Sequence, residues 1–137
     1  MLAVVDTGPL YAVVDEDDAD HAPCRAILED PRYRFVIPAL VVAEAAYLVG
    51  SRLGPAVEAR FLRGLEAMDI EGPEPADWRR IADLVEEYAD FPLGGADASV
   101  VALAERLGAS TIVTLDVRHF AAIRPRRGRS FRLLPQG

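Results

Sequence analysis

Short apolar segments alternate along the chain with longer amphipathic ones, and this alternation predicts strands and helices in turn. The segments LAVV (2–5), RFVI (34–37) and STIVTL (110–115) have the length and apolar character of buried strands. DIEG (69–72) is a candidate short strand and FRLL (131–134) a candidate last strand. Near-continuous apolar strands separated by helices are typical of a parallel sheet covered on both faces. We therefore predict an α/β fold, with a central parallel sheet between layers of helices.

The segments between these strands have helical periodicity and recognisable start and stop residues. Gly8-Pro9 can open one helix, Pro38 starts the long apolar helix PALVVAEAAYLVG, and Gly108 ends the helix DASVVALAERLG. Four further helices are predicted at 18–30, 55–68, 75–89 and 116–123. One face of the 75–89 helix is expected to be buried, and it is formed by Ile81, Leu84, Val85 and Tyr88.

The apolar helix that starts at Pro38 carries one carboxylate, Glu44, in its middle. We expect this helix to be buried on most sides, where an unpaired ionised carboxylate costs several kcal/mol or more. No neighbour of Glu44 at helical spacing carries a positive charge. Either Glu44 lies on an exposed stripe of alanines or faces a distant arginine, or it points to the edge of the sheet and has a function there.

Length and composition fit one soluble domain over residues 1–137, with 51% hydrophobic residues. No apolar run reaches the ~18 residues of a membrane helix, and the N-terminus lacks the basic start of a signal peptide. Cys24 is the single cysteine, which excludes an internal disulfide and a cysteine-based zinc site. Together with Trp78, it is expected to be a packing residue. We therefore expect a cytoplasmic protein without membrane contact.

The charges of the chain exclude several mechanisms. A net charge of -7 argues against a protein that grips nucleic acid by bulk electrostatics. Every basic residue other than histidine is arginine, so chemistry that needs a phosphate-binding or Schiff-base lysine is excluded. The arginines are concentrated in RPRRGRSFR (124–132). This cluster is either a solvated tail or a contact for a partner that carries phosphates.

Four carboxylates are predicted to meet at the carboxyl edge of the sheet, where parallel α/β sheets bind ligands. Asp6 follows the first strand, Asp116 follows STIVTL, Asp97 begins a helix and Glu44 lies one to two turns into another. Taken singly, Asp6, Asp97 and Asp116 could each be an ordinary helix cap or turn residue. Caps have no reason to converge, however, and several carboxylates at one edge repel each other unless a cation is present.

This set of ligands indicates a hard divalent ion. Carboxylate and water oxygens suit Mg²⁺ or Mn²⁺, and no histidine or cysteine stands at the spacing of a zinc site. The matching chemistry is attack of metal-activated water on a phosphodiester.

The chain resembles the PIN domains, and in particular the VapC-type toxins of bacterial toxin–antitoxin pairs. The resemblance rests on four motifs in order, VVDTGPLYA, PALVVAEAAYLV, LGGADASVVALAERLG and IVTLDVRHF, and it covers essentially the whole chain. It implies a three-layer α/β/α fold and a divalent-metal-dependent endoribonuclease that cuts RNA. It further implies a homodimer and a small antitoxin that blocks the site.

The same resemblance assigns roles to individual residues. It implies that the metal-binding acids are Asp6, Glu44, Asp97 and Asp116. Thr7 and Thr114 match hydroxyl positions beside these acids that hold a water or a phosphate, and Arg118 with the 124–132 cluster is a candidate RNA contact. Many relatives carry another acid a few residues before the equivalent of Asp97. Here that stretch is LGGAD, so this ligand position is missing.

Two other functions are compatible with parts of the sequence. A PIN-like domain with a silent site would act only through contacts with RNA or protein, although its acids would then have no reason to be intact. A phosphatase with Asp6 as its nucleophile would want a second aspartate two positions later, where Gly8 stands, and a lysine that the chain lacks. His119 is interpreted as a helix-packing residue, and His21 is given no role.

Overall fold

The computed structural model describes residues 1–126 and 128–135 of the chain. Position 127 and the last two residues lie outside this description, so Arg127 of the arginine cluster is left aside. The chain alternates strands and helices from its start, as the apolar pattern predicted. In order, the elements are β1 (Leu2–Val5), α1 (Thr7–Ala12), α2 (His21–Leu28), β2 (Arg34–Pro38), α3 (Ala39–Leu53), α4 (Pro55–Gly64), a 3₁₀ turn (Leu65–Ala67), β3 (Ile70–Glu71), α5 (Pro75–Glu87), α6 (Gly95–Leu107), β4 (Thr111–Val113), α7 (Val117–Ala122) and β5 (Arg132–Leu134).

The five strands form one sheet in the order β3-β2-β1-β4-β5, and every neighbouring pair is parallel. The central strand β1 pairs with β2 on one side, where Val4 lies opposite Val36, and with β4 on the other, where Val5 lies opposite Val113. The chain therefore leaves β1 toward one half of the sheet and returns to its other side at β4. Such a reversal opens a crevice at the carboxyl ends of the two strands, which is where α/β sheets bind ligands.

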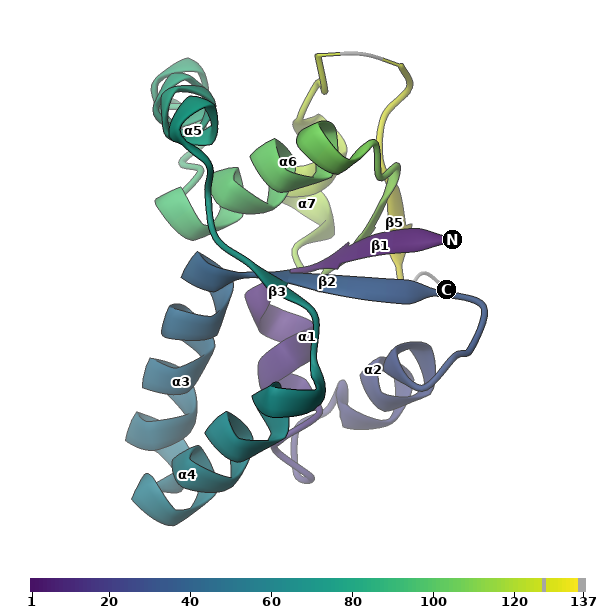
Figure 1. Cartoon of the computed structure of the whole chain (residues 1–137), viewed down its shortest axis with the longest axis vertical. Helices are drawn as coiled ribbons and strands as arrows, with labels where there is room; N and C mark the ends of the chain where they lie inside the picture. The colour runs from purple at the N-terminus through teal and green to yellow at the C-terminus, as the bar shows by residue number, and fades with distance from the viewer. Residues whose placement is uncertain (127, 136–137) are drawn as a thin grey trace.

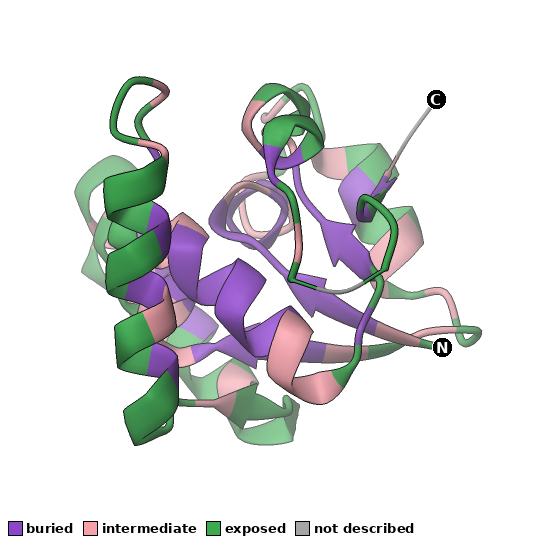
Figure 2. Cartoon of the chain, turned by 90° about the horizontal axis from the view of Figure 1, so that it is seen from above, coloured by how far each residue is buried: buried purple, intermediate pink, exposed green. Residues whose placement is uncertain are grey.

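Helices cover both faces of the sheet, so the predicted three-layer α/β/α arrangement is confirmed (Figure 1). One layer consists of α5, α6 and α7, and the other contains α1 to α4 (Figure 1). Helix α6 lies against the sheet and is buried from Ala98 to Ala104, because α5 covers its outer side (Figure 2). It ends at Gly108, whose φ of 69° is left-handed and suits the predicted helix stop. Within the described residues, no helix is long and apolar enough to cross a membrane.

Helix α3 is less buried than its composition predicted. Only Val41, Ala45 and Val49 are fully buried, and they form a single stripe at a spacing of four residues. The opposite side is open to solvent, and Tyr47 there is 73% exposed. The expectation that this helix is buried on most sides is therefore wrong, because elements pack against one side of it only.

Two residues of α5 also differ from their predictions. Ile81 and Leu84 are buried as expected, but Val85 is exposed and Trp78 is 52% exposed. Helix α5 forms the outer surface of its layer, so only the side facing α6 has a partner to pack against (Figure 2). The interpretation of Trp78 as a packing residue is therefore wrong.

Candidate active site

A cavity of about 450 Å³ lies at the carboxyl edge of the sheet, in the crevice between β1 and β4. Its lining comes from four separate parts of the chain: the start of α1, the middle of α3, the start of α6 and the segment between β4 and α7. All four predicted acids are on this cavity. The lining residues are Asp6, Thr7, Gly8, Glu44, Leu48, Asp97, Leu115 and Asp116.

Asp6 is the most deeply buried of these acids, with 3% of its surface exposed. Its backbone N–H donates to the Val113 carbonyl at 2.9 Å, which ties the end of β1 to β4. Its Oδ2 accepts a hydrogen bond of 2.8 Å from the Thr114 hydroxyl, whereas Oδ1 has no partner among the described residues. Asp6 stands at the N-cap position of α1 but makes no capping bond. Burial raises its pKa above the ordinary value, against the opposing effect of the Thr114 hydrogen bond.

Asp97 lies in the first turn of α6, after the N-cap residue Gly94 in the chain. The helix dipole favours a negative charge there. Its pKa is nevertheless raised to about 7, first by burial and then by repulsion from Asp6 and Glu44. Asp116 adds a smaller repulsion. The position is thus that of a common first-turn acid, but the surroundings disfavour its charge.

Glu44 reaches the cavity from α3, although its side chain is exposed. The prediction that a buried position makes this carboxylate costly is therefore wrong. Its negative charge still contributes to raising the pKa values of Asp6 and Asp97. Glu44 therefore lines the cavity and repels the charges of the other two acids. Because its side chain is exposed, solvent screens part of its own charge.

Asp116 is the one acid of the four with a basic neighbour among the described residues. As the N-cap of α7, its Oδ1 accepts the His119 backbone N–H at 3.2 Å and contacts the ring Nδ1 of His119 at 2.9 Å. The His119 ring in turn stacks on Phe91, with a distance of 4.4 Å between the ring centroids. The guanidinium of Arg118 lies 5.0 Å from the same Phe91 ring. No sequence motif indicates this role of Phe91, because its contacts with His119 and Arg118 join two segments far apart in the chain.

The two threonines differ in what their hydroxyls do. Thr114 donates to Asp6 and accepts the Asp116 backbone N–H at 2.9 Å, so it holds the two acids in a fixed relation. Thr7 lines the cavity, and its buried hydroxyl has no partner among the described residues. Gly8 allows the close approach of α1 here, since a Cβ at this position would lie 3.3 Å from Leu115.

The donors of this cavity fit a divalent cation, although they are spread around it. In residues 1–126 and 128–135, no three His, Cys, Asp or Glu side chains stand close enough together to hold a metal ion as placed. Mutually repelling carboxylates have no reason to converge without a cation. The free Oδ1 of Asp6 and the raised pKa of Asp97 are the features that a hard cation would relieve.

The sequence also singled out Cys24, His21 and the arginine cluster, and their outcomes differ. Cys24 is buried, as expected, and burial raises its pKa to about 11. His21 lies away from the cavity, with its Nδ1 at 2.8 Å from the Ala12 carbonyl oxygen. Of the arginine cluster, Arg132 pairs with Thr111 at the beginning of β4, which is the opposite edge of the sheet. Arg126, Arg129 and Arg132 therefore do not border the four acids.

Fold and site together define an α/β protein with an acidic cavity at the switch point of a parallel sheet. Comparison with known proteins identifies the family. The chain belongs to the PIN domain family, whose model matches residues 3–124.

Individual relatives agree with this assignment. The chain is 37% identical over 134 residues to Ribonuclease VapC26 of Mycobacterium tuberculosis, which covers 96% of this chain and 99% of that protein. Among solved structures, VapC20 of M. tuberculosis, described as a sarcin-ricin loop cleaving toxin, matches with a TM-score of 0.72 at 17% identity over 80% of this chain and 86% of that one. VapBC2 of Rickettsia felis, bound to a promoter DNA fragment, matches with a TM-score of 0.71 at 17% identity over 97% of both chains. These two structures share the fold.

Proposed function

We propose that the chain is a divalent-metal-dependent endoribonuclease and the toxin of a type II toxin–antitoxin pair, built as one catalytic domain. The observation that carries this proposal is the set of four acids around one cavity, of which only Asp116 has a basic neighbour among the described residues. Uncompensated carboxylates with perturbed pKa values are typical of functional sites. The 37% identical relative is named a ribonuclease, which supports the same reaction.

Mg²⁺ or Mn²⁺ is the proposed cofactor, and Asp6, Glu44, Asp97 and Asp116 are the residues that would hold it. When bound, such an ion supplies an activated water and stabilises negative charge on the scissile phosphate. Asp6 would contribute its free Oδ1. Glu44 is exposed, so we expect it to contribute less than the buried Asp6.

The surrounding residues of the chain would order these acids and the substrate. Thr114 is bonded to both Asp6 and Asp116, so we assign it to positioning the acids. The Thr7 hydroxyl is free to bind a water or a phosphate oxygen in the cavity. The exposed guanidinium of Arg118, next to Phe91, is a proposed contact for an RNA phosphate on the side of Asp116.

A protein partner that covers the cavity is the second part of the proposal. Tyr47 lies three residues after Glu44 on α3, so the two side chains share one helix face, and Tyr47 is largely exposed. An antitoxin that packs on Tyr47 would also close the mouth of the acidic cavity. We further propose that the protein is a homodimer acting on RNA in the cytoplasm. The mass in solution by light scattering, with and without the antitoxin, tests both assemblies.

Cleavage of RNA by the wild type and by Asp6→Asn is the decisive test of the activity. We expect cleavage with Mg²⁺ or Mn²⁺, none with EDTA, and a loss of about 10³-fold in Asp6→Asn, because metal catalysis supplies several kcal/mol. Asp83→Asn is the matched control, since Asp83 is an exposed acid of α5 without an ion pair to any described residue. Undiminished cleavage by Asp6→Asn would contradict the mechanism.

A thermal shift with Mn²⁺ separates this function from that of a silent PIN-like binding module. An ion at one hundred times its Kd stabilises a folded protein by about 2.7 kcal/mol, which corresponds to roughly 8 °C for a domain of this size. We expect this rise in the wild type and in Asp83→Asn, and its loss in Asp6→Asn. An equal Tm with and without Mn²⁺, together with RNA binding and no cleavage, would favour the silent module.

A further inference from the structure

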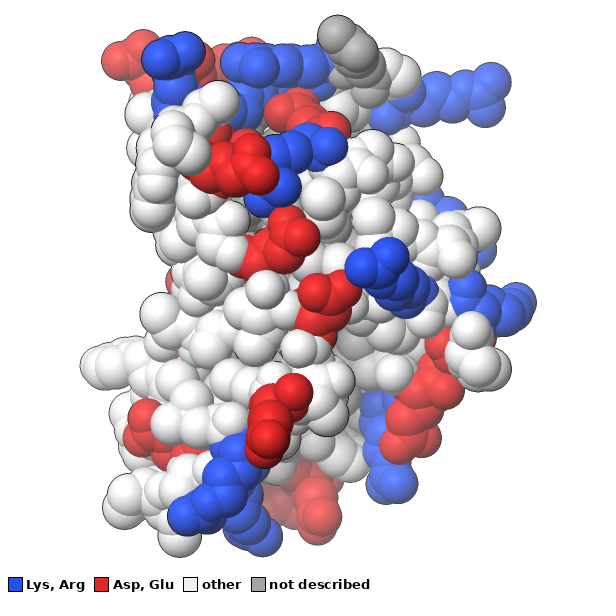
Figure 3. Space-filling view, viewed as in Figure 1, with Lys and Arg blue, Asp and Glu red and all other residues white. Residues whose placement is uncertain are grey.

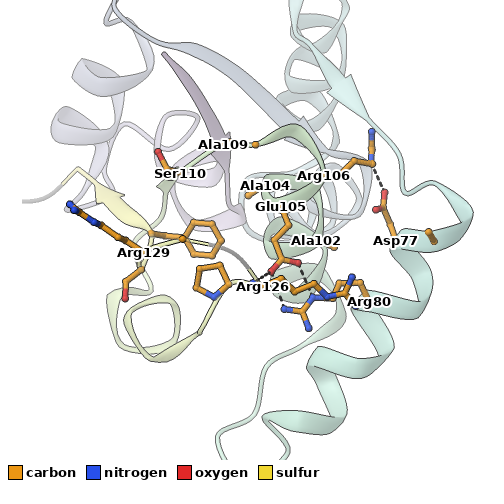
Figure 4. A pocket seen from close by; sticks show the side chains of 16 residues that line it. Asp77, Arg80, Ala102, Ala104, Glu105, Arg106, Ala109, Ser110, Arg126 and Arg129 are labelled. Carbon is orange, nitrogen blue, oxygen red and sulfur yellow. Dashed lines mark hydrogen bonds and ion pairs between the residues drawn. The ribbon is translucent and has the colours of Figure 1, made fainter.

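A second cavity, of about 730 Å³, lies away from the four acids, at the amino edge of the sheet. It is enclosed by α5, the C-terminal half of α6, the start of β4 and the segment that precedes β5. Figure 4 shows this cavity with charged side chains around it. The charged residues that line it are Asp77, Arg80, Glu105, Arg106, Arg126 and Arg129.

The two acids of this cavity are neutralised by arginines of the neighbouring helix. Arg80 donates from Nε and Nη2 to the two carboxylate oxygens of Glu105, at 2.8 and 2.9 Å. Both side chains are largely buried, at 12% and 14% exposure. Arg106 donates from Nε to Asp77 at 2.8 Å in the same way. These pairs tie α5 to α6 and neutralise the two acids of the lining, Asp77 and Glu105. Arg106 also pairs with Glu71 and Glu74, which lie outside the lining.

The segment before β5 adds positive charge that no acid balances. The backbone N–H of Arg126 donates to Glu105 at 2.7 Å, which holds this segment against α6 (Figure 4). The side chains of Arg126 and Arg129 are exposed and form no ion pair with any residue in 1–126 or 128–135. Arginine side chains gather at this end of the molecule, over α5 and the segment before β5 (Figure 3). The lining thus has two cations in excess, on a chain whose net charge is -7.

Helix α6 connects this cavity to the candidate active site. Asp97 stands in its first turn and Glu105 near its end, eight residues later. At 1.5 Å per residue this separation is about 12 Å along the helix. Because α6 is buried along its middle, an RNA strand between the two cavities must follow a longer path over the surface. With one phosphate per about 3.4 Å of a stacked strand, this path takes at least about four nucleotides. One RNA strand could therefore reach both cavities.

We propose that this cavity binds a backbone phosphate of the RNA substrate, at least about four nucleotides from the bond that is cut. The choice of RNA as the ligand rests on the proposed function. Arg126 and Arg129 are the contacting residues, and guanidinium groups suit phosphate because they donate two parallel hydrogen bonds. Arg80 is held by Glu105 and shapes the wall. Phosphate contacts of this kind add affinity and register, and they leave the choice of sequence to other residues.

Binding of labelled single-stranded RNA in EDTA tests the proposal without any need for cleavage. For the double variant Arg126→Ala/Arg129→Ala, we expect the Kd of a 12-nucleotide RNA to rise about tenfold. The slope of log K against log salt should fall by about 0.7 for each lost contact. A three-nucleotide RNA, too short to reach both cavities, should bind the wild type more weakly than the 12-nucleotide RNA. Arg126→Lys/Arg129→Lys keeps the charge and should retain most of the salt slope.

The matched control is Arg60→Ala/Arg63→Ala, which removes two exposed arginines of α4 that form no ion pair with described residues. An unchanged Kd and salt slope in the Arg126/Arg129 double variant, or an equal loss in this control, overturns the proposal. Binding of hexaglutamate by the wild type but not by the double variant, with RNA binding unchanged, would make the cavity a protein docking site instead. Failure of the wild type to cleave RNA refutes the proposed function and leaves this measurement intact.

Discussion

The two cavities contain the same kind of residue in opposite electrostatic surroundings. Asp6 and Asp77 are both buried aspartates, with 3% and 7% of their surface exposed. Asp77 at the amino edge is paired with Arg106, whereas Asp6 at the carboxyl edge has one hydroxyl partner, and the charge of Glu44 adds to burial in disfavouring its ionised form. The larger cavity is the one with paired charges. Compensation of charge, more than volume, therefore distinguishes the candidate catalytic site from its surroundings.

This difference has a simple energetic meaning. A buried acid that is paired with an arginine stabilises the packing of two helices only as long as both partners remain. A buried acid without such a partner weakens the fold, and a chain retains it where the charge serves a ligand or a reaction. Removing one carboxylate should therefore have opposite effects on stability at the two edges of the sheet.

The largest effect on stability is expected for Glu105→Gln at the amino edge. The substitution leaves the largely buried guanidinium of Arg80 without its anion, which costs about 3 kcal/mol. We expect a fall in Tm of roughly 10 °C by calorimetry. Glu86→Gln, at an exposed acid of α5 with no ion pair to a described residue, should leave Tm nearly unchanged. Equal Tm values for the two variants would show that the paired acid contributes nothing.

The opposite sign is expected for Asp97→Asn at the carboxyl edge, in metal-free protein. The pKa of Asp97 in the fold, about 7, lies above its ordinary value of 3.8, so the folded state keeps a proton that the unfolded state has lost. The stability of the wild type should therefore fall as pH rises from about 4 through about 7, and Asn should remove this part of the fall. We expect the variant to exceed the wild type in Tm at about pH 8 in EDTA, with a smaller difference at about pH 5. A difference independent of pH would contradict the assignment.

The smallest effect is expected for Phe91→Leu, which tests how Asp116 is positioned. Loss of the stacking between Phe91 and His119 should cost about 1 kcal/mol and loosen the contact of His119 with Asp116. We expect a kcat about fivefold lower, because the acid is less well positioned, and a smaller rise in KM, because Arg118 also loses its contact with the ring. Phe91→Tyr keeps the aromatic ring and should restore kcat. If Tyr and Leu behave alike, the ring acts only as packing volume.

Local pattern was sufficient for the strands and for the four acids. The runs around Val4, Val36 and Ile112 are apolar throughout because both faces of a parallel sheet are covered, and this periodicity is visible in the sequence. Acids that follow such strands must emerge at one edge, since all parallel strands end there. The placement of Asp6 and Asp116 on one cavity could therefore be predicted without knowing any contact.

The exposure of helix faces could not be predicted in the same way. The burial of Glu44, Trp78 and Val85 was predicted wrongly, because an apolar helix is buried only where another element covers it. The composition of a helix indicates how much surface it could bury, but it does not indicate which element packs against which of its faces. The stacking of Phe91 on His119 has the same origin, since it joins the segment between α5 and α6 to helix α7.

The sequence by itself determined the order of the elements, the parallel sheet and the edge of the sheet at which the four acids lie, because these follow from periodicity and chain direction. Only the tertiary structure decided which charges are paired. Arg80 and Glu105 are 25 residues apart, and they meet because α5 packs on α6. Arg126, Arg129 and Arg132 likewise lie at the amino edge, because β5 runs parallel to β4. Charge pairing depends on contacts between distant segments, and such contacts exist only once the layers have packed.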